Sequence, residues 1–167
     1  HVEIIQFDQI GDIWLRDYAP FQIRKDGELR VIRANYEPSY HYSEAVKNYS
    51  KADRNVSGQL AKMFHNQDFT DLKIDGYHIK LDGGNLIHNG NGTAIITNRI
   101  ISKNEHFSIE EIRDALREHL GIKELILIPT EPGDNTGHAD GLVRFLDECT
   151  LLISDYPDDW VNDESYI

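Results

Sequence analysis

Side chains capable of chemistry gather in three short segments of this 167-residue chain. In the last of them, His138 lies between two acids, Asp134 and Asp140. A nearby carboxylate raises the pKa of a histidine and fixes its tautomer, which prepares the imidazole for proton transfer. His138 and Asp140 alternate along an extended segment, so both side chains point to the same face. The pattern predicts proton transfer by His138, although the same trio also offers oxygen and imidazole ligands for a metal ion.

The other two segments supply groups that suit a cationic ligand. Residues 12–20 bring Trp14 and Asp17 into a loop between strands, where functional side chains are tolerated. Asp17 could accept a guanidinium group in a bidentate fork. Trp14 could cover the alkyl part of such a ligand or pack in the core. In residues 81–85, paired glycines follow Asp82 and allow a close approach of the backbone, and Asp82 could orient a histidine, as the acid of a triad does, or serve only in a turn.

Asp17, Asp82 and Asp140 share one position relative to a predicted β-hairpin. Each acid comes shortly before a hairpin whose turn contains Asp, Asn or Gly, residues that favour tight turns. The predicted strand pairs are 21–24 with 28–32, 85–88 with 93–97, and 142–146 with 149–153. An acid, a spacer and a hairpin therefore recur three times along the chain.

Helices and single strands complete the predicted unit. The further predicted elements are a Tyr-rich loop over 36–49, a weak helix around 56–64, a strand at 77–81, a helix over 108–120 and a strand at 125–128. Ser108 and Glu111 form a capping box for the second helix, and Gly121 ends it. A unit of hairpin, helix and strand thus recurs roughly every 60 residues, with two units and the start of a third.

The repeat predicts an α+β fold in which the units are arranged radially. A radial array must close to protect its edges, and it directs the starts of the hairpins toward its axis. Asp17, Asp82 and Asp140 would then meet in one pocket, where their mutual repulsion favours a bound cation. The alternative for each acid is a local hydrogen bond in a turn. Because two and a half units are too few to close, and residues 163–167 show no terminal helix, we expect the chain to be a fragment.

Charge and composition narrow the classes of partner. A formal net charge of −12 repels phosphate backbones, so we expect no nucleic-acid partner. The acidity would suit a small cationic substrate, and the alternative is that an acidic surface only keeps the protein in solution. No apolar run approaches the roughly 20 residues of a membrane span, so no membrane partner is expected. The single cysteine, Cys149, leaves no internal disulfide and no cysteine-based zinc site. Its apolar hairpin strand predicts a buried side chain rather than a nucleophile.

Taken in order, the three motifs resemble the agmatine deiminase and Porphyromonas-type peptidyl-arginine deiminase family, within the guanidine-modifying superfamily of five-bladed α/β propellers (the pentein fold). The matching residues are 14–17 with Pro20, 82–85 with Gly92 and Thr93, and 134–140. The resemblance extends over essentially the whole chain. It implies that residues 1–167 are the middle blades of one deiminase domain whose N-terminal and C-terminal parts lie outside this sequence.

The resemblance also implies a reaction and a role for each site residue. Family members hydrolyse agmatine to N-carbamoylputrescine and ammonia, or peptidyl-arginine to citrulline, through a thiouronium intermediate on a cysteine, without metal or cofactor. The implied catalytic residues are His138 as the general acid and base and Asp82, which orients it where relatives carry Glu. The implied substrate-binding residues are Asp17, Asp140, Trp14 and Asp134. Because the family's nucleophile follows the point where this sequence stops, the 167 residues alone are expected to be inactive.

Two other functions stay open on the sequence alone. One is a metal-dependent hydrolase that uses Asp134, His138 and Asp140; the other is a domain that binds guanidinium groups without catalysis. The lack of a visible signal segment and the single cysteine favour a cytoplasmic location and agmatine as the substrate. Assembly as a homo-oligomer is left open.

Overall fold

The computed structural model describes residues 4–7, 10–38, 44–65 and 69–155. The helices and strands of these ranges, in chain order, are α1 (Leu15–Tyr18), β1 (Phe21–Lys25), β2 (Glu28–Arg33), α2 (Glu44–His65), β3 (Thr70–Asp71), β4 (Lys73–Ile74), β5 (Tyr77–His78), η1 (Gly83–Asn85), β6 (Ile87–His88), β7 (Thr93–Thr97), α3 (Arg99–Lys103), α4 (Ile109–Leu120), β8 (Glu124–Ile128), η2 (Ala139–Gly141), β9 (Val143–Phe145) and β10 (Leu151–Ile153). The two η elements are short 3₁₀ turns.

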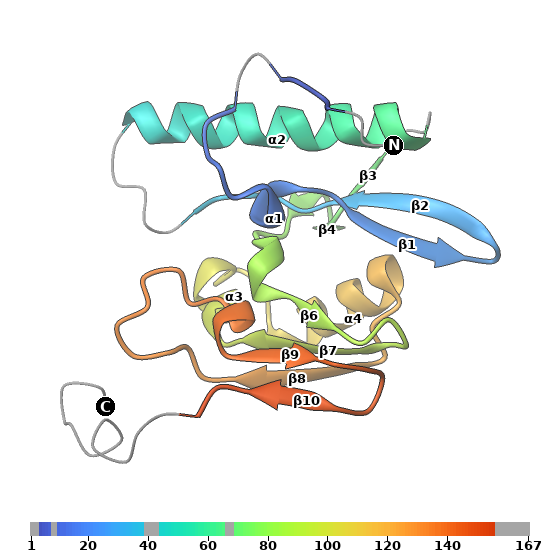
Figure 1. Ribbon diagram of the computed structural model, residues 1–167, viewed down its shortest axis with the longest axis vertical. Coiled ribbons are helices and arrows are strands. Elements are labelled where there is room, and N and C mark those ends of the chain that lie inside the picture. The colour runs from blue at the N-terminus through green and yellow to red at the C-terminus, as the bar shows by residue number, and fades with distance from the viewer. Residues whose placement is uncertain (1–3, 8–9, 39–43, 66–68, 156–167) are drawn as a thin grey trace.

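The predicted repeat is present as two small sheets with the same topology. In one sheet β1 and β2 pair antiparallel and β3 joins β2 in parallel; in the other β6 and β7 pair antiparallel and β8 joins β7 in parallel. Helices α2 and α4 make the respective crossovers, and the hairpin β9–β10 begins a third unit. Figure 1 shows α2 across the top of the molecule with β1 and β2 beneath it, and the second and third units below. The hairpin–helix–strand unit predicted from the sequence is confirmed, but the first unit is closed by β3 and not by the predicted strand at 77–81. Residues 77 and 78 of that predicted strand form β5, which pairs with β4 instead.

Local sequence explains the first hairpin and the best helix. Asp26 and Gly27 form the β1–β2 turn with φ of 54° and 81°, the pair of left-handed conformations that a two-residue hairpin needs. Ser108 and Glu111 make the predicted capping box at the start of α4, and Gly121 ends the helix at φ 72°. Both signals act within a few residues, so the sequence alone is sufficient to place them.

One hydrophobic core joins the first two units. The apolar stripe of α4, including Ile112 and Leu116, packs with Ile96 of β7 and Ile32 of β2. A smaller cluster ties the third hairpin to the second unit, and a third cluster packs Tyr36 and neighbouring residues against α2. The shared core fixes the starts of the three hairpins relative to one another, which is where the acids lie.

Several boundaries differ from the predictions. Helix α2 begins at Glu44 and not near residue 56, so much of the Tyr-rich stretch is helical, because Glu, Ala and Lys continue the helix where an apolar period is weak. The predicted loop also contains residues 39–43, which lie outside the described residues, as do residues 163–167. The third hairpin is shorter than expected, and the short helix α3 was not predicted.

The prediction of a buried Cys149 is wrong. Cys149 is exposed in the turn between β9 and β10, where its backbone N–H donates to Asp147. The side chains of Asn89 and Asn91 donate to the neighbouring Glu148, so this turn packs against the β6–β7 turn, at the opposite end of the hairpins from the acids. Two polar residues before Cys149 end the strand early, which leaves the cysteine outside the apolar run.

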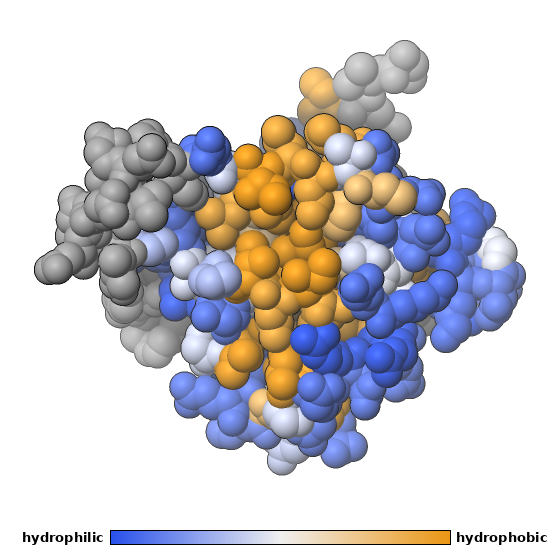
Figure 2. Space-filling model, turned by 90° about the horizontal axis from the view of Figure 1, so that it is seen from below, coloured by the Kyte–Doolittle hydropathy of each residue, from blue (hydrophilic) through white to orange (hydrophobic). Residues whose placement is uncertain are grey.

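An apolar face remains exposed around the third hairpin. The large apolar side chains involved are Ile126, Leu146, Leu151, Leu152 and Ile153, which are between 37% and 65% exposed. Figure 2, seen from below, shows apolar side chains gathered over this side of the molecule. Within the described ranges, no helix is long and apolar enough to cross a lipid bilayer.

Candidate active site

Gly84 is the point at which the three segments meet. A Cβ atom built on Gly84 would lie 2.6 Å from Oδ1 of Asp17, 2.7 Å from Nδ1 of His138 and 3.1 Å from Oδ2 of Asp140. These residues come from α1, from the segment before η2 and from η2 itself, so they converge only in the folded chain. The predicted close approach at the paired glycines is therefore present, and it brings a histidine and two acids around a position that has no side chain.

Asp17 is held in place by this glycine. The single turn of α1 lifts Asp17 out of the loop, and its Oδ1 accepts a 2.9 Å hydrogen bond from the backbone N–H of Gly84. Gly83 lies equally close to the first unit, because a Cβ there would lie 2.1 Å from the carbonyl oxygen of Arg16. Asp17 is only 9% exposed. The Gly-Gly pair thus permits a backbone contact that places the carboxylate of Asp17 beside His138.

Asp82 and His138 form a buried hydrogen-bonded pair. Nε2 of His138 lies 3.1 Å from Oδ2 of Asp82, and Nδ1 lies 3.6 Å from Oδ1 of Asp17. Asp82 is 2% exposed and His138 is 8% exposed. The predicted contact between Asp82 and His138 is therefore present in the structure, in agreement with an orienting acid and not with a turn residue alone.

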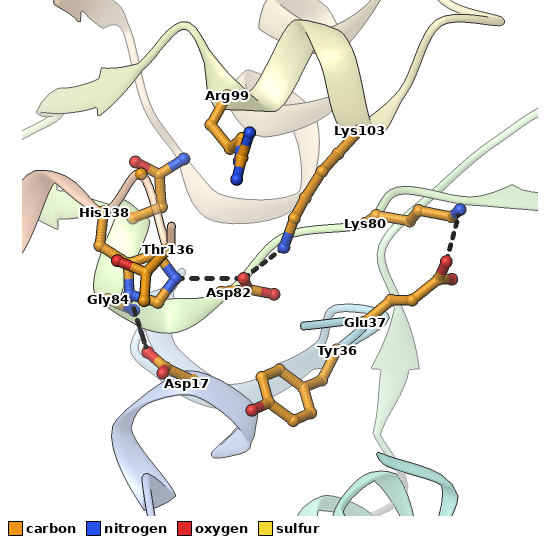
Figure 3. A network of polar contacts seen from close by, with 12 residues as sticks. Asp17, Tyr36, Glu37, Lys80, Asp82, Gly84, Arg99, Lys103, Thr136 and His138 are labelled. Carbon is orange, nitrogen blue, oxygen red and sulfur yellow. Dashed lines mark hydrogen bonds and ion pairs between the residues drawn. The ribbon is translucent and has the colours of Figure 1, made fainter. Parts of the chain in front are cut away.

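A lysine that the sequence did not single out completes the group. Lys103, at the end of α3, donates a hydrogen bond to the same oxygen of Asp82 that faces His138. Figure 3 shows the line of contacts from Lys103 through Asp82 to His138, with Asp17 and Gly84 on the far side of the ring. The lysine is 21 residues from Asp82 in the chain and on an unpredicted helix, so no local pattern indicated it.

The surrounding charges change the proton affinity of each group. Burial lowers the pKa of His138, but the hydrogen bond to Asp82 and the charges of Asp17, Asp82 and Asp140 outweigh burial and raise it above its ordinary value of 6.5. Burial raises the pKa of Asp17 above 3.8. For Asp82, burial is outweighed by His138 and Lys103, which hold its pKa below 3.8. The site thus favours a protonated His138 beside an ionised Asp82.

Asp134 shapes the loop that carries His138. Its carboxylate accepts hydrogen bonds from the backbone N–H groups of Thr136, Gly137 and His138 at 2.8, 2.9 and 3.2 Å. Burial raises the pKa of Asp134, but a hydrogen bond from the side-chain hydroxyl of Thr136, together with these backbone bonds, holds it below its ordinary value. Oδ1 of Asn85, in the segment after the paired glycines, accepts from the N–H of Ala139 and ties the same loop to η1. Direct contact of Asp134 with a substrate stays a prediction.

Asp140 and Trp14 are more exposed than the buried groups around Gly84. The side chain of Asp140 is 26% exposed and is 3.9 Å from the guanidinium of Arg144. Trp14 is 57% exposed at the start of α1, so packing in the core does not account for it. A role for Trp14 as a cover for a ligand is consistent with this exposure and stays a prediction.

Two of the three residues suggested as metal ligands, Asp134 and His138, make other contacts in the structure. In the part of the chain that the structure describes, no group of three or more His, Cys, Asp or Glu side chains is placed to hold a metal ion. Both carboxylate oxygens of Asp134 accept loop hydrogen bonds, and Nε2 of His138 faces Asp82. The geometry therefore gives no support to a site made of Asp134, His138 and Asp140.

Comparison with solved structures defines the fold group of the chain. An agmatine deiminase from C. jejuni is 25% identical, with a TM-score of 0.72 over 93% of this chain and 44% of that chain. A dimethylarginine dimethylaminohydrolase shares the fold at 9% identity, with a TM-score of 0.52 over 93% of this chain and 50% of that chain. The chain thus has the mixed α/β fold that these two enzymes share.

The sequence comparisons then define the family. The profile of the Porphyromonas-type peptidyl-arginine deiminase family matches residues 2–166, and the chain belongs to this family. Among curated relatives, the agmatine deiminase of Pseudomonas fluorescens is 27% identical over 156 residues, which cover 89% of this chain and 41% of the relative. The chain therefore spans less than half the length of that relative.

Proposed function

We propose that the protein containing this chain is a guanidine deiminase that acts on agmatine. Water would replace one terminal nitrogen of the guanidinium group, giving N-carbamoylputrescine and ammonia. The same chemistry on a peptidyl-arginine would give citrulline. The observation that carries the proposal is the cluster around Gly84, where His138 and two carboxylates converge beside the Asp82–His138 pair.

The charge of the cluster suits a guanidinium ion. Asp17 and Asp140 present carboxylate oxygens on one side of His138, and a planar guanidinium offers N–H donors to two carboxylates at once. Burial raises the pKa of Asp17 despite the nearby His138, and the charges of Asp82 and Asp140 add to that rise. A bound cation would counter this effect, so we assign Asp17 and Asp140 to guanidinium binding, with Trp14 over the alkyl chain.

His138 would move the protons in both halves of the reaction. A cysteine thiolate attacks the guanidinium carbon, the C–N bond breaks, and the protonated His138 donates its proton to the departing ammonia. His138 then takes a proton from water as the water attacks the thiouronium carbon. The C–S bond breaks to release the ureido product and the thiolate, and the remaining hydroxyl proton of the tetrahedral adduct passes to solvent. The raised pKa of His138 suits the first step, in which a proton must be given.

The nucleophile would come from another part of the protein. Cys149, the one cysteine among these 167 residues, lies in the turn at the opposite end of the hairpins from His138. The match to less than half of the curated relative supports a longer protein with further units. We propose that these units continue the array into a five-bladed propeller and cover the apolar face of the third hairpin. The cytoplasmic location expected from the sequence stays a prediction. Assembly as a homo-oligomer stays open.

The acids provide the test of this proposal. In the intact protein, Asp17→Asn and Asp140→Asn should each lower kcat/KM for ammonia release from agmatine by about 10- to 150-fold, because each removes a hydrogen bond to a charged group worth about 1.5–3 kcal/mol. Asp26→Asn is the matched control, since Asp26 is exposed in the β1–β2 turn. Activity that disappears with a chelator and returns with zinc or manganese would contradict the proposal, and so would tight agmatine binding without ammonia release.

A further inference from the structure

Lys103 is a largely buried cation beside the Asp82–His138 pair. Its side chain is only 10% exposed, whereas lysines are rarely buried unless they are paired. The partner is Asp82, which is 2% exposed and therefore also withdrawn from water. Burying both charges is costly, and their attraction only offsets that cost when the geometry is good. Such a pair is a weak source of stability, so its position next to His138 needs another explanation.

The end of α3 is fixed against the segment that leads to Asp82. Asn104, the residue after Lys103, accepts a 2.8 Å hydrogen bond from the backbone N–H of Lys80 and donates a 2.9 Å bond to its carbonyl oxygen. Asn104 is 4% exposed, so these two bonds are sheltered from water. Lys103 therefore starts from a backbone position that is tied to the chain two residues before Asp82. This anchoring places Lys103 within reach of Asp82.

Lys103 and His138 share one oxygen of Asp82. Oδ2 of Asp82 receives the Lys103 ammonium and also faces Nε2 of His138 at 3.1 Å. Within the described residues, Oδ1 of Asp82 is buried without a hydrogen-bond partner. A carboxylate with one engaged oxygen and one unengaged oxygen can rotate, and the second donor on Oδ2 opposes that rotation. The orientation of Asp82 toward His138 thus depends on Lys103.

We propose that Lys103 is a positioning residue, whose ammonium holds the carboxylate of Asp82 in the orientation in which Oδ2 engages Nε2 of His138. This inference rests on the proposed function, because the orientation matters only if His138 transfers protons. With Nε2 fixed on Asp82, Nδ1 faces Asp17 and the space around Gly84, where the guanidinium group would lie. Lys103 would touch neither substrate nor reacting atoms.

The role of Lys103 can be measured through the pKa of His138, which depends on the charged groups around the imidazole. The charged groups around His138 are Asp17 from α1, Asp82 before η1, Asp134 in the loop, Asp140 from η2, and Lys103 and Arg99 from α3. Three of the acids favour the imidazolium form of His138. Loss of the Lys103 charge alone would raise the pKa of His138, whereas rotation of Asp82 away from Nε2 would remove a hydrogen bond that favours the imidazolium and would lower this pKa. Positioning by Lys103 therefore predicts a lower pKa of His138 when Lys103 is replaced.

The experiment uses variants of the intact protein, with agmatine turnover and NMR titration of ¹³C-labelled histidine rings as separate measurements. Lys103→Met should lower kcat by at least about tenfold while KM changes less than about threefold, and should lower the pKa of His138. A rise in that pKa would contradict positioning, because it would show a charge effect with the contact between Asp82 and His138 intact. Lys103→Arg should restore most of kcat and the wild-type pKa. Lys103→Gln removes the charge but keeps polarity, in case the Met variant does not fold. Lys80→Met is the control, because Lys80 pairs with Glu37.

A double-mutant cycle separates positioning from general stability. In an Asp82→Asn background, Lys103→Met should cause less than about a twofold further loss of kcat, because the carboxylate that it positions is already gone. A full and additive loss, or a single Lys103→Met variant with kcat and His138 pKa unchanged, would overturn the inference. If the wild-type protein releases no ammonia from any guanidine, the proposed function fails, while the NMR titration still decides whether Lys103 controls His138.

Discussion

Asp82→Asn should lower kcat for guanidine hydrolysis in the intact protein by about 10³- to 10⁴-fold, the loss that follows when the orienting acid of a triad becomes an amide. The carboxylate of Asp82 accepts from Nε2–H of His138 and so selects the tautomer with Nδ1 facing the substrate side. An amide can turn its NH₂ group toward Nε2 and stabilise the opposite tautomer. Lys103 would favour this orientation of the amide, because its ammonium would attract the amide oxygen and leave the NH₂ group facing Nε2.

The same substitution should also destabilise the fold. It leaves Lys103 as a buried cation without its partner, which costs about 3–5 kcal/mol of unfolding free energy. In the wild type, the raised pKa of His138 contributes stability below pH 6.5 that is lost as pH rises through the folded pKa, and the lowered pKa of Asp82 contributes stability above pH 3.8 that is lost as pH falls. Urea unfolding should therefore show the largest difference between wild type and variant from pH 3.8 to 6.5.

Asp82→Glu is the matched comparison for the asparagine variant. It keeps the negative charge for Lys103 and His138 and lengthens the side chain by one methylene, so it should retain more activity and more stability than Asp82→Asn. An asparagine variant with kcat within about tenfold of the wild type would show that Asp82 does not orient the histidine.

Gly84→Ala should remove most activity while leaving much of the fold intact. The new methyl group would lie 2.6 Å from Oδ1 of Asp17 and 2.7 Å from Nδ1 of His138, so both groups must move. A shift of about 1 Å in a positioned catalytic group can cost about 10²-fold in rate, and we expect kcat/KM to fall at least that far. Overpacking should lower the unfolding free energy by about 1–3 kcal/mol, measured by urea denaturation.

Two neighbouring glycines act as controls for this prediction. A Cβ on Gly83 would lie 2.1 Å from the carbonyl oxygen of Arg16, and backbone cannot yield easily, so Gly83→Ala should reduce stability more than Gly84→Ala. Gly141, next to Asp140, has no atom within 4 Å of such a Cβ and no positive φ, so Gly141→Ala should leave activity and stability near wild type. Gly84→Ala with wild-type kcat/KM would mean that the space at Gly84 is not the site.

What the sequence predicted correctly comes mainly from short-range signals. The Asp26–Gly27 turn and the Ser108–Glu111 capping box each act over two to four residues and are present as expected. The repeat extended these local predictions to the whole chain, because equivalent residues of successive units take equivalent positions in the fold. That reasoning brought Asp17, Asp82 and Asp140 to one region, and the structure places them around His138.

What the sequence missed depends on contacts between distant segments. Helix α3 has five residues, too few for an apolar period, and Lys103 gains its role only from the packing of α3 beside Asp82. The sequence also did not indicate that the carboxylate of Asp134 accepts three backbone N–H groups of the following turn, an arrangement common to Asp in loops. Cys149 was expected in a strand, but the strand begins two residues later.

Calorimetric titration of agmatine tests most directly the claim that Asp17 and Asp140 hold a guanidinium group. The intact protein with His138→Asn is the suitable form, because it should bind substrate without turning it over. We expect agmatine to bind at least about tenfold more tightly than putrescine, a diamine without a planar guanidinium. Adding Asp17→Asn or Asp140→Asn to the His138→Asn protein should weaken agmatine binding by about 10- to 150-fold. Equal binding of the two amines, or agmatine binding that is insensitive to both acids, would contradict the claim.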